Sequence, residues 1–147
     1  MSTFIMNIWD KRFLDLAKHV SLWSKDPSTK VGAVISDGKN RIVSVGYNGF
    51  PVGISDLDER LENRKLKYEY IVHAEINCIL FANKSLDGCT LYTYPMFPCS
   101  RCCSQIIQSG ISKVISVEID NIRWAESIEL SKSMLKEAGI EFYFYKE

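Results

Sequence analysis

The chain has 147 residues, of which 46% are hydrophobic and 24% charged, and this composition is typical of a folded globular protein. Its 18 basic and 18 acidic residues cancel to a net charge of zero, which argues against a nucleic-acid binder that relies on a strong positive field. No apolar run approaches the ~20 residues of a membrane span, and the first ten residues show no secretory signal. We therefore expect one cytoplasmic domain over residues 1–147, without membrane or nucleic-acid partners.

The first half of the chain predicts a helix, a hairpin and a charged segment. Apolar residues recur at helical spacing over Asp10–Trp23, and the Asp-Pro-Ser-Thr sequence at 26–29 ends this helix. Two runs of branched residues, Val31–Ile35 and Arg41–Gly46, flank a turn signal and predict a β-hairpin. After a loop, the charged stretch Asp56–Lys67 is either an exposed helix or a mobile loop.

The second half alternates between helices and strands. Helices are expected at Ala74–Ala82, Pro98–Ser109 and Trp124–Ala138, and strands at Thr90–Thr93, Val114–Val117 and Ile140–Tyr145. Strand–helix–strand alternation implies parallel pairing with right-handed crossovers. The sequence thus predicts an α/β fold with a five-stranded mixed sheet and helices on both faces.

The five cysteines are not expected to form a disulfide framework. Their number is odd and no secretory signal accompanies them, so we expect a reducing compartment. Three of them, Cys99, Cys102 and Cys103, lie within five residues, which suggests metal or redox chemistry. Cys78 and Cys89 are interpreted as small apolar fillers.

Two short motifs, His73-Ala74-Glu75 and Pro98-Cys99-x-x-Cys102, are typical of metal chemistry. Two cysteines three positions apart at a helix start can face one metal, and the helix N-terminus favours the thiolate form that binds zinc. His73 at the start of another helix can supply a third ligand, which leaves the fourth position open, as in catalytic zinc sites. Glu75, two residues after His73, can lie beside the metal and carry a proton to the substrate.

Each part of this pattern has another interpretation. The cysteine pair alone is compatible with a redox motif after a strand or with half of a structural zinc site. The combination of His-x-Glu with Pro-Cys-x-x-Cys is more specific, because it is the signature of the zinc deaminases. Cys103 falls one position past the pair and turns away by about 100° on a helix, so it is predicted not to be a ligand.

The chain resembles the cytidine deaminase superfamily, and within it the deoxycytidylate (dCMP) deaminases, over roughly residues 10–144. The similarity is carried by four segments: residues 26–34, 46–51, 70–77 and 97–110. The resemblance implies a three-layer α/β/α fold. It also implies hydrolytic deamination of dCMP to dUMP with release of ammonia, which supplies dUMP for dTMP synthesis.

The resemblance also implies the roles of the catalytic residues. One zinc ion, held by His73, Cys99 and Cys102, would activate the water that attacks C4 of the cytosine ring. Glu75 would protonate N3 and then help the amine to leave.

Substrate contacts follow from the same resemblance. Asn48 is expected against the sugar or base, and the backbone at Ala74 and Pro98 is expected at the pyrimidine edge. A 5′-phosphate needs a cation, and Arg123 resembles an arginine of the family near this group. Lys30 is the second candidate, and Arg123 could instead be an ordinary surface residue.

Family members are often homohexamers that dCTP activates and dTTP inhibits, and Mg²⁺ could accompany such a nucleotide triphosphate. Residues 47–58 lie in the part of the chain associated with this regulation. Many members have a cysteine after the Pro-x-Gly of the loop, whereas Ile54 follows Gly53 here. No cysteine or further histidine lies between Ile54 and His73, so we expect one zinc per chain.

Two other functions remain open at this point. The chain could deaminate a free nucleoside, guanine or a base in RNA. An enzyme that acts on RNA is expected to have a basic surface, and the net charge of zero argues against one here. Alternatively, it could be a zinc-stabilised binding module without catalysis. That module would have no need for Glu75.

Overall fold

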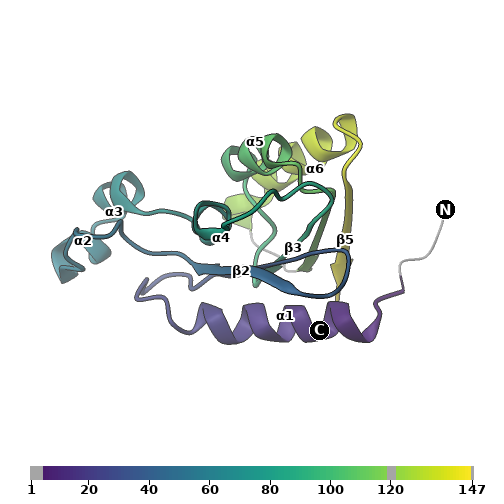
Figure 1. The fold of residues 1–147 in the computed structure, drawn as a ribbon. Coiled ribbons are helices and arrows are strands. Elements are labelled where there is room, and N and C mark those ends of the chain that lie inside the picture. The colour runs from purple at the N-terminus through teal and green to yellow at the C-terminus, as the bar shows by residue number, and fades with distance from the viewer. Residues whose placement is uncertain (1–4, 119–121, 147) are drawn as a thin grey trace.

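Five strands form one mixed sheet in the computed structural model, which describes residues 5–118 and 122–146 (Figure 1). They are β1 (Gly32–Ser36), β2 (Ile42–Tyr47), β3 (Thr90–Tyr94), β4 (Lys113–Val117) and β5 (Glu141–Tyr145), in the spatial order β2-β1-β3-β4-β5. β1 is antiparallel to β2 and β3, whereas β3, β4 and β5 are parallel. The predicted hairpin and the predicted parallel half are both confirmed.

Helices cover both faces of the sheet, as predicted. On one face lies α1 (Ile8–Ser21), and on the other lie α4 (Ala74–Phe81), α5 (Ser100–Ser109) and α6 (Ala125–Glu137) (Figure 1). Two short helices, α2 (Asp58–Glu62) and α3 (Arg64–Tyr70), lie outside these layers, and the 3-10 turn η1 (Ile122–Trp124) precedes α6. None of the described helices is long and apolar enough to cross a membrane.

The alternation of side chains along the central strands divides the core into two layers. Ala33 and Ile35 of β1 pack in the layer under α4 and α5, whereas Val34 between them packs in the layer against α1. Leu91 and Tyr92 of β3 divide in the same way. Successive side chains of a strand point to opposite faces of the sheet. When both faces are covered, the sequence of a central strand is therefore a continuous apolar run.

Several element boundaries differ from the sequence prediction. The first helix begins at Ile8 rather than Asp10, because the Asn7 side chain accepts the Asp10 N–H at 2.8 Å and caps the helix. The charged stretch 56–67 forms parts of two short helices, α2 and α3, rather than one helix or a loop. The end of α5 agrees with the prediction, since Gly110 adopts a left-handed conformation with φ 92°.

A close approach of β2 and α4 places the start of α4. A Cβ atom at Gly46 would lie 2.7 Å from the Ala74 carbonyl oxygen and 2.7 Å from the Cys78 backbone nitrogen, so only glycine fits between strand and helix. His73 precedes α4 directly. The height of the helix above the sheet therefore also sets the position of this histidine.

Candidate active site and metal centre

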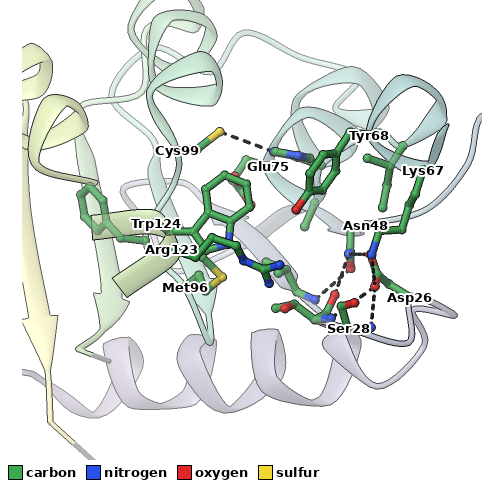
Figure 2. Close-up of a pocket in the computed structure, with 16 residues that line it drawn as sticks. Asp26, Ser28, Asn48, Lys67, Tyr68, Glu75, Met96, Cys99, Arg123 and Trp124 are labelled. Carbon is green, nitrogen blue, oxygen red and sulfur yellow. Dashed lines mark hydrogen bonds and ion pairs between the residues drawn. The ribbon is translucent and has the colours of Figure 1, made fainter. Parts of the chain in front are cut away.

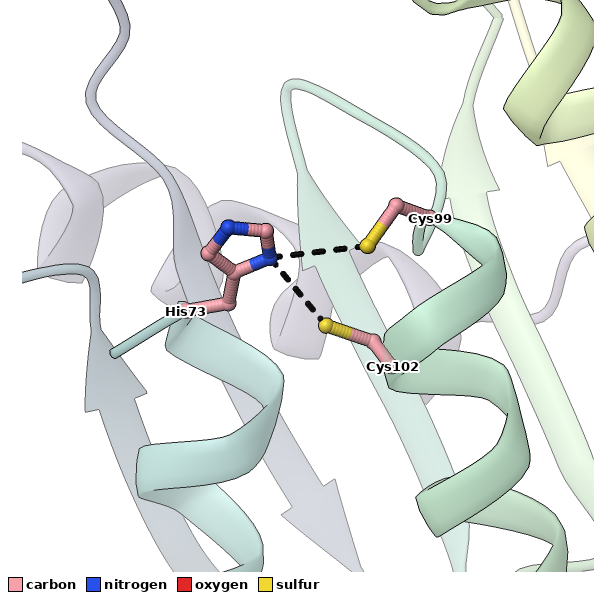
Figure 3. Close-up of side chains that lie close together, drawn as sticks. All are labelled: His73, Cys99 and Cys102. Atoms are coloured by element: carbon pink, nitrogen blue, oxygen red, sulfur yellow. Dashed lines mark hydrogen bonds between the residues drawn. The ribbon is translucent and has the colours of Figure 1, made fainter. Parts of the chain in front are cut away.

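The three predicted metal ligands converge at the N-termini of two helices. His73 is the N-cap of α4, Cys99 is the N-cap of α5, and Cys102 lies in the first turn of α5. Their ligating atoms all lie within 4.8 Å of one another. His73 Nδ1 is 3.2 Å from Cys102 Sγ and 3.5 Å from Cys99 Sγ (Figure 3). In a tetrahedral zinc site with Zn–N of about 2.0 Å and Zn–S of about 2.3 Å, nitrogen and sulfur lie about 3.5 Å apart, so this donor set fits zinc.

The electrostatics of the cluster also suit a divalent cation. The pKa of the Cys99 thiol is lowered to about 4, chiefly by a hydrogen bond from Cys102 and also by His73. The same hydrogen bond raises the pKa of Cys102, which keeps the shared proton. A zinc ion would displace such protons, because thiolate and neutral imidazole are the ligating forms. Both helices add partial positive charge at this point.

Glu75 lies beside the cluster in the first turn of α4. Its side chain is buried, with 4% of the residue exposed, and it lines the same pocket as His73 and Cys99. Burial raises the pKa of this carboxyl group. A carboxyl group whose pKa lies above its usual range is suited to both accepting and donating a proton.

The pocket in front of the cluster is built from segments far apart in the sequence (Figure 2). Besides His73, Glu75 and Cys99, it is lined by three of the predicted substrate-contact residues: Asn48, Ala74 and Arg123. Arg123 comes from η1 and extends over the pocket in Figure 2. The structure thus brings six of the predicted site residues into one pocket wall, and the roles assigned to them stay predictions.

Asn48 braces this wall through its amide group. Its Oδ1 accepts the Val31 N–H at 2.9 Å, and its Nδ2 donates to the Thr29 carbonyl at 2.9 Å. An amide oxygen has two lone pairs, so Oδ1 retains acceptor capacity toward a hydroxyl group in the pocket.

Two predicted substrate contacts do not line the pocket. The Lys30 ammonium donates to the Ser24 carbonyl at 2.5 Å and stays outside the pocket wall. Pro98 is fully buried, and its carbonyl accepts the Ser131 hydroxyl of α6 at 2.8 Å. Its neighbours Met96 and Phe97 line the pocket instead.

Sequence reasoning missed the residues that close the far side of the pocket. Lys67, inside a run of charges that predicts an exposed segment, is buried and pairs with Asp26 at 3.0 Å. Tyr68 and Trp124 meet edge to face with ring centroids 6.3 Å apart. Nothing in the local pattern distinguishes Lys67 from its exposed neighbours, because its partner lies 41 residues away.

Comparisons with known proteins agree with this site. Residues 7–118 match the family model described as the cytidine and deoxycytidylate deaminase zinc-binding region. An uncharacterized deaminase of Aliivibrio fischeri is 49% identical over 136 residues, covering 90% of each chain. The deoxycytidylate deaminase of Mus musculus is 40% identical, covering 91% of this chain and 78% of that protein.

The fold is also that of a solved deaminase. The crystal structure of dCMP deaminase from cyanophage S-TIM5 in complex with dCMP and dUMP superposes with a TM-score of 0.75 at 24% identity, over 98% of this chain and 100% of that one. This agreement confirms the predicted three-layer fold. Because the family model covers most of the chain and relatives above 30% identity align over most of their length, the chain belongs to the cytidine and deoxycytidylate deaminase family.

Proposed function

We propose that this protein hydrolyses dCMP to dUMP and ammonia. The observation that carries the proposal is the cluster of His73, Cys99 and Cys102 with a buried Glu75 in the same pocket. The choice of dCMP is supported by relatives named deoxycytidylate deaminase, such as the mouse protein. The related cyanophage structure contains dCMP and dUMP.

In this proposal Glu75 moves the protons. Zinc, when bound by His73, Cys99 and Cys102, supplies a Lewis acid that makes water a nucleophile near neutral pH. Glu75 takes a proton from the attacking water and delivers it to N3 while the water oxygen bonds to C4. Glu75 then takes the remaining proton from the hydroxyl group at C4 and passes it to the amino group. The C4–N bond breaks, ammonia leaves, and a carbonyl forms at C4.

Three further residues would hold the substrate. The backbone at Ala74 lies beside the metal ligands, where the pyrimidine edge would be bound, and Asn48 offers an amide oxygen to the base or sugar. Arg123 would take the 5′-phosphate, because a guanidinium group can form two parallel hydrogen bonds with it. Its place on the pocket wall supports this role.

The direct test measures ammonia release and product identity with dCMP, deoxycytidine, guanine and a short RNA. Rapid formation of dUMP, with much slower turnover of deoxycytidine, is the expected result. Preference for deoxycytidine would indicate a nucleoside deaminase. A protein that binds zinc and releases no ammonia from any of these substrates would be a binding module instead.

We also propose a homohexamer that dCTP with Mg²⁺ activates and dTTP inhibits, and whose dUMP feeds dTMP synthesis. The family resemblance supports the assembly, the regulation and the role of dUMP. Exposed apolar side chains on β2 and α4 also support the assembly. Ile42, Leu80 and Phe81 are 57%, 67% and 57% exposed, which favours an interaction surface. Sedimentation tests the assembly, and rate curves against dCMP with either nucleotide test the regulation. A monomer of 16.8 kDa at micromolar concentration would contradict the hexamer.

A further inference from the structure

A buried lysine closes the side of the pocket opposite the metal ligands. Lys67 of α3 is 3% exposed, and its Nζ lies 3.0 Å from Oδ1 of Asp26, which is 6% exposed (Figure 2). Burying two charges costs desolvation energy that their attraction need not repay, so a buried ion pair is weak evidence for a stabilising role. The surroundings of the pair indicate what else it does.

Asp26 is the centre of a hydrogen-bond network in the pocket wall. Its Oδ1 accepts the backbone N–H groups of Ser28 at 2.8 Å and Thr29 at 3.2 Å. Its Oδ2 lies 3.4 Å from Nδ2 of Asn48, which in turn donates to the Thr29 carbonyl. The carboxylate that Lys67 neutralises therefore fixes both the loop after Asp26 and the Asn48 amide.

Lys67 also attaches α3 to the rest of the molecule. Of residues 58–70, which include α2 and α3, Lys67 alone is buried. The next residue, Tyr68, lies at the edge of the pocket against Trp124, and the Lys67 Nζ is 5.8 Å from the Tyr68 ring centroid. One ion pair thus links the wall that holds Asn48 to the helix that carries Tyr68.

We infer that Lys67 is a positioning residue for substrate binding: its ion pair with Asp26 sets Asn48 in the pocket wall and Tyr68 at the pocket edge. The inference rests on the proposed deamination of dCMP. Because Asn48 and Tyr68 line the pocket and are not among the metal ligands, loss of the ion pair should displace a bound substrate and leave the metal ligands in place.

The test compares Lys67→Met with Lys65→Met. Lys65 is exposed on the same helix, so its variant controls for the loss of a lysine from α3. For Lys67→Met, KM should rise and kcat/KM should fall by up to roughly 100-fold, the loss that a misplacement of about 1 Å can cause. The rise should be similar for dCMP and deoxycytidine, kcat should change less, and zinc content should stay unchanged. Lys65→Met should behave like the wild type.

A double variant keeps the test valid if Lys67→Met folds poorly. Lys67→Met leaves a buried, unpaired carboxylate, whereas Asp26→Asn with Lys67→Met removes both charges. The double variant should melt at a higher temperature than Lys67→Met, yet its KM should stay raised, because the network around residue 26 is not restored.

Three results would overturn the inference. A loss confined to dCMP would make Lys67 a direct phosphate contact, and a lower melting temperature with unchanged KM in both variants would make the pair purely structural. Wild-type kinetics in Lys67→Met would show that the ion pair is dispensable. If the wild-type protein itself releases no ammonia from dCMP, the proposed function fails as well, which the parallel wild-type assay reveals.

Discussion

The two sides of the pocket are built in different ways. On the metal side, His73, Cys99 and Cys102 sit at the starts of α4 and α5. Helix geometry sets the spacing of the two cysteines, and the packing of α4 on β2 sets the position of His73. On the opposite side, Asp26 and Lys67 come from a loop and a peripheral helix that contact each other across 41 residues of sequence. The metal ligands therefore lie on elements packed into the core, whereas the opposite side of the pocket includes a peripheral helix whose one buried residue is Lys67.

This difference separates chemistry from binding. Variants on the metal side should lower turnover or remove the metal, whereas variants on the opposite side should change KM. A variant that violates this division would show that the two sides are coupled.

The largest effect is expected from Cys99→Ser on the metal side. Replacing a thiolate by a hydroxyl group removes one of three ligands, so zinc and ammonia release should both be lost. Metal analysis together with the ammonia assay checks this. Cys103→Ser is the matched control, because Cys103 is buried in the core beside the cluster and is not among the three converging ligands. A fully active Cys99→Ser protein, or two tightly held zinc ions per wild-type chain, would refute the site.

On the metal side, Glu75→Gln should lower turnover without loss of zinc. Glutamine keeps the size of the side chain but cannot carry a proton, so kcat should fall by about 10²–10⁴-fold while zinc is retained. Zinc content and turnover measured on one preparation decide the point. Wild-type turnover in this variant would place the proton relay on another group.

Arg123→Ala probes the substrate side. Loss of a charge-assisted hydrogen bond of roughly 1.5–3 kcal/mol should lower kcat/KM for dCMP by about 10–150-fold. Deoxycytidine has no phosphate and should be affected little. Parallel kinetics on the two substrates measure the difference. Equal losses on both would make Arg123 structural, and the phosphate would need another cation.

The smallest effect on activity is expected on the far face of the sheet. The hydroxyl of Tyr92 donates to Asp10 at 2.6 Å under α1, away from the pocket. Tyr92→Phe should lower the free energy of unfolding by roughly 1.5–3 kcal/mol and leave kinetics unchanged.

The same contact predicts a pH dependence. Burial, with the hydrogen bond to Asp10, raises the pKa of Tyr92 above its ordinary 10.0. This contribution to stability is complete below pH 10 and is lost as pH rises above it. Denaturant unfolding between pH 8 and 11 should therefore show a smaller loss in Tyr92→Phe than in the wild type. Equal alkaline losses would contradict this assignment.

Sequence reasoning succeeds where the relevant contacts are local. Helical spacing and the glycine at position 110 predicted α5. The convergence of Cys99 and Cys102 with His73, which lies 26 and 29 residues away, was predicted from the combined deaminase signature rather than from local contacts. Sequence reasoning failed for Lys67, since burial there depends on a partner outside any local pattern. Pro98 and Lys30, which the family resemblance and the need for a phosphate cation suggested as substrate contacts, do not line the pocket, and their roles stay predictions. Their polar groups are engaged by Ser131 and Ser24 instead.

The contact at Gly46 has a consequence for how this enzyme tolerates mutation. Position 46 bears no functional group and does not line the pocket, yet any side chain there would push against the backbone at Ala74 and Cys78. A screen that scores activity would thus mark Gly46 as intolerant, alongside the ligands themselves. A homologue with alanine at this position should carry a compensating change in the register or height of α4. Glycine at position 46 should therefore be retained in homologues that keep the metal site.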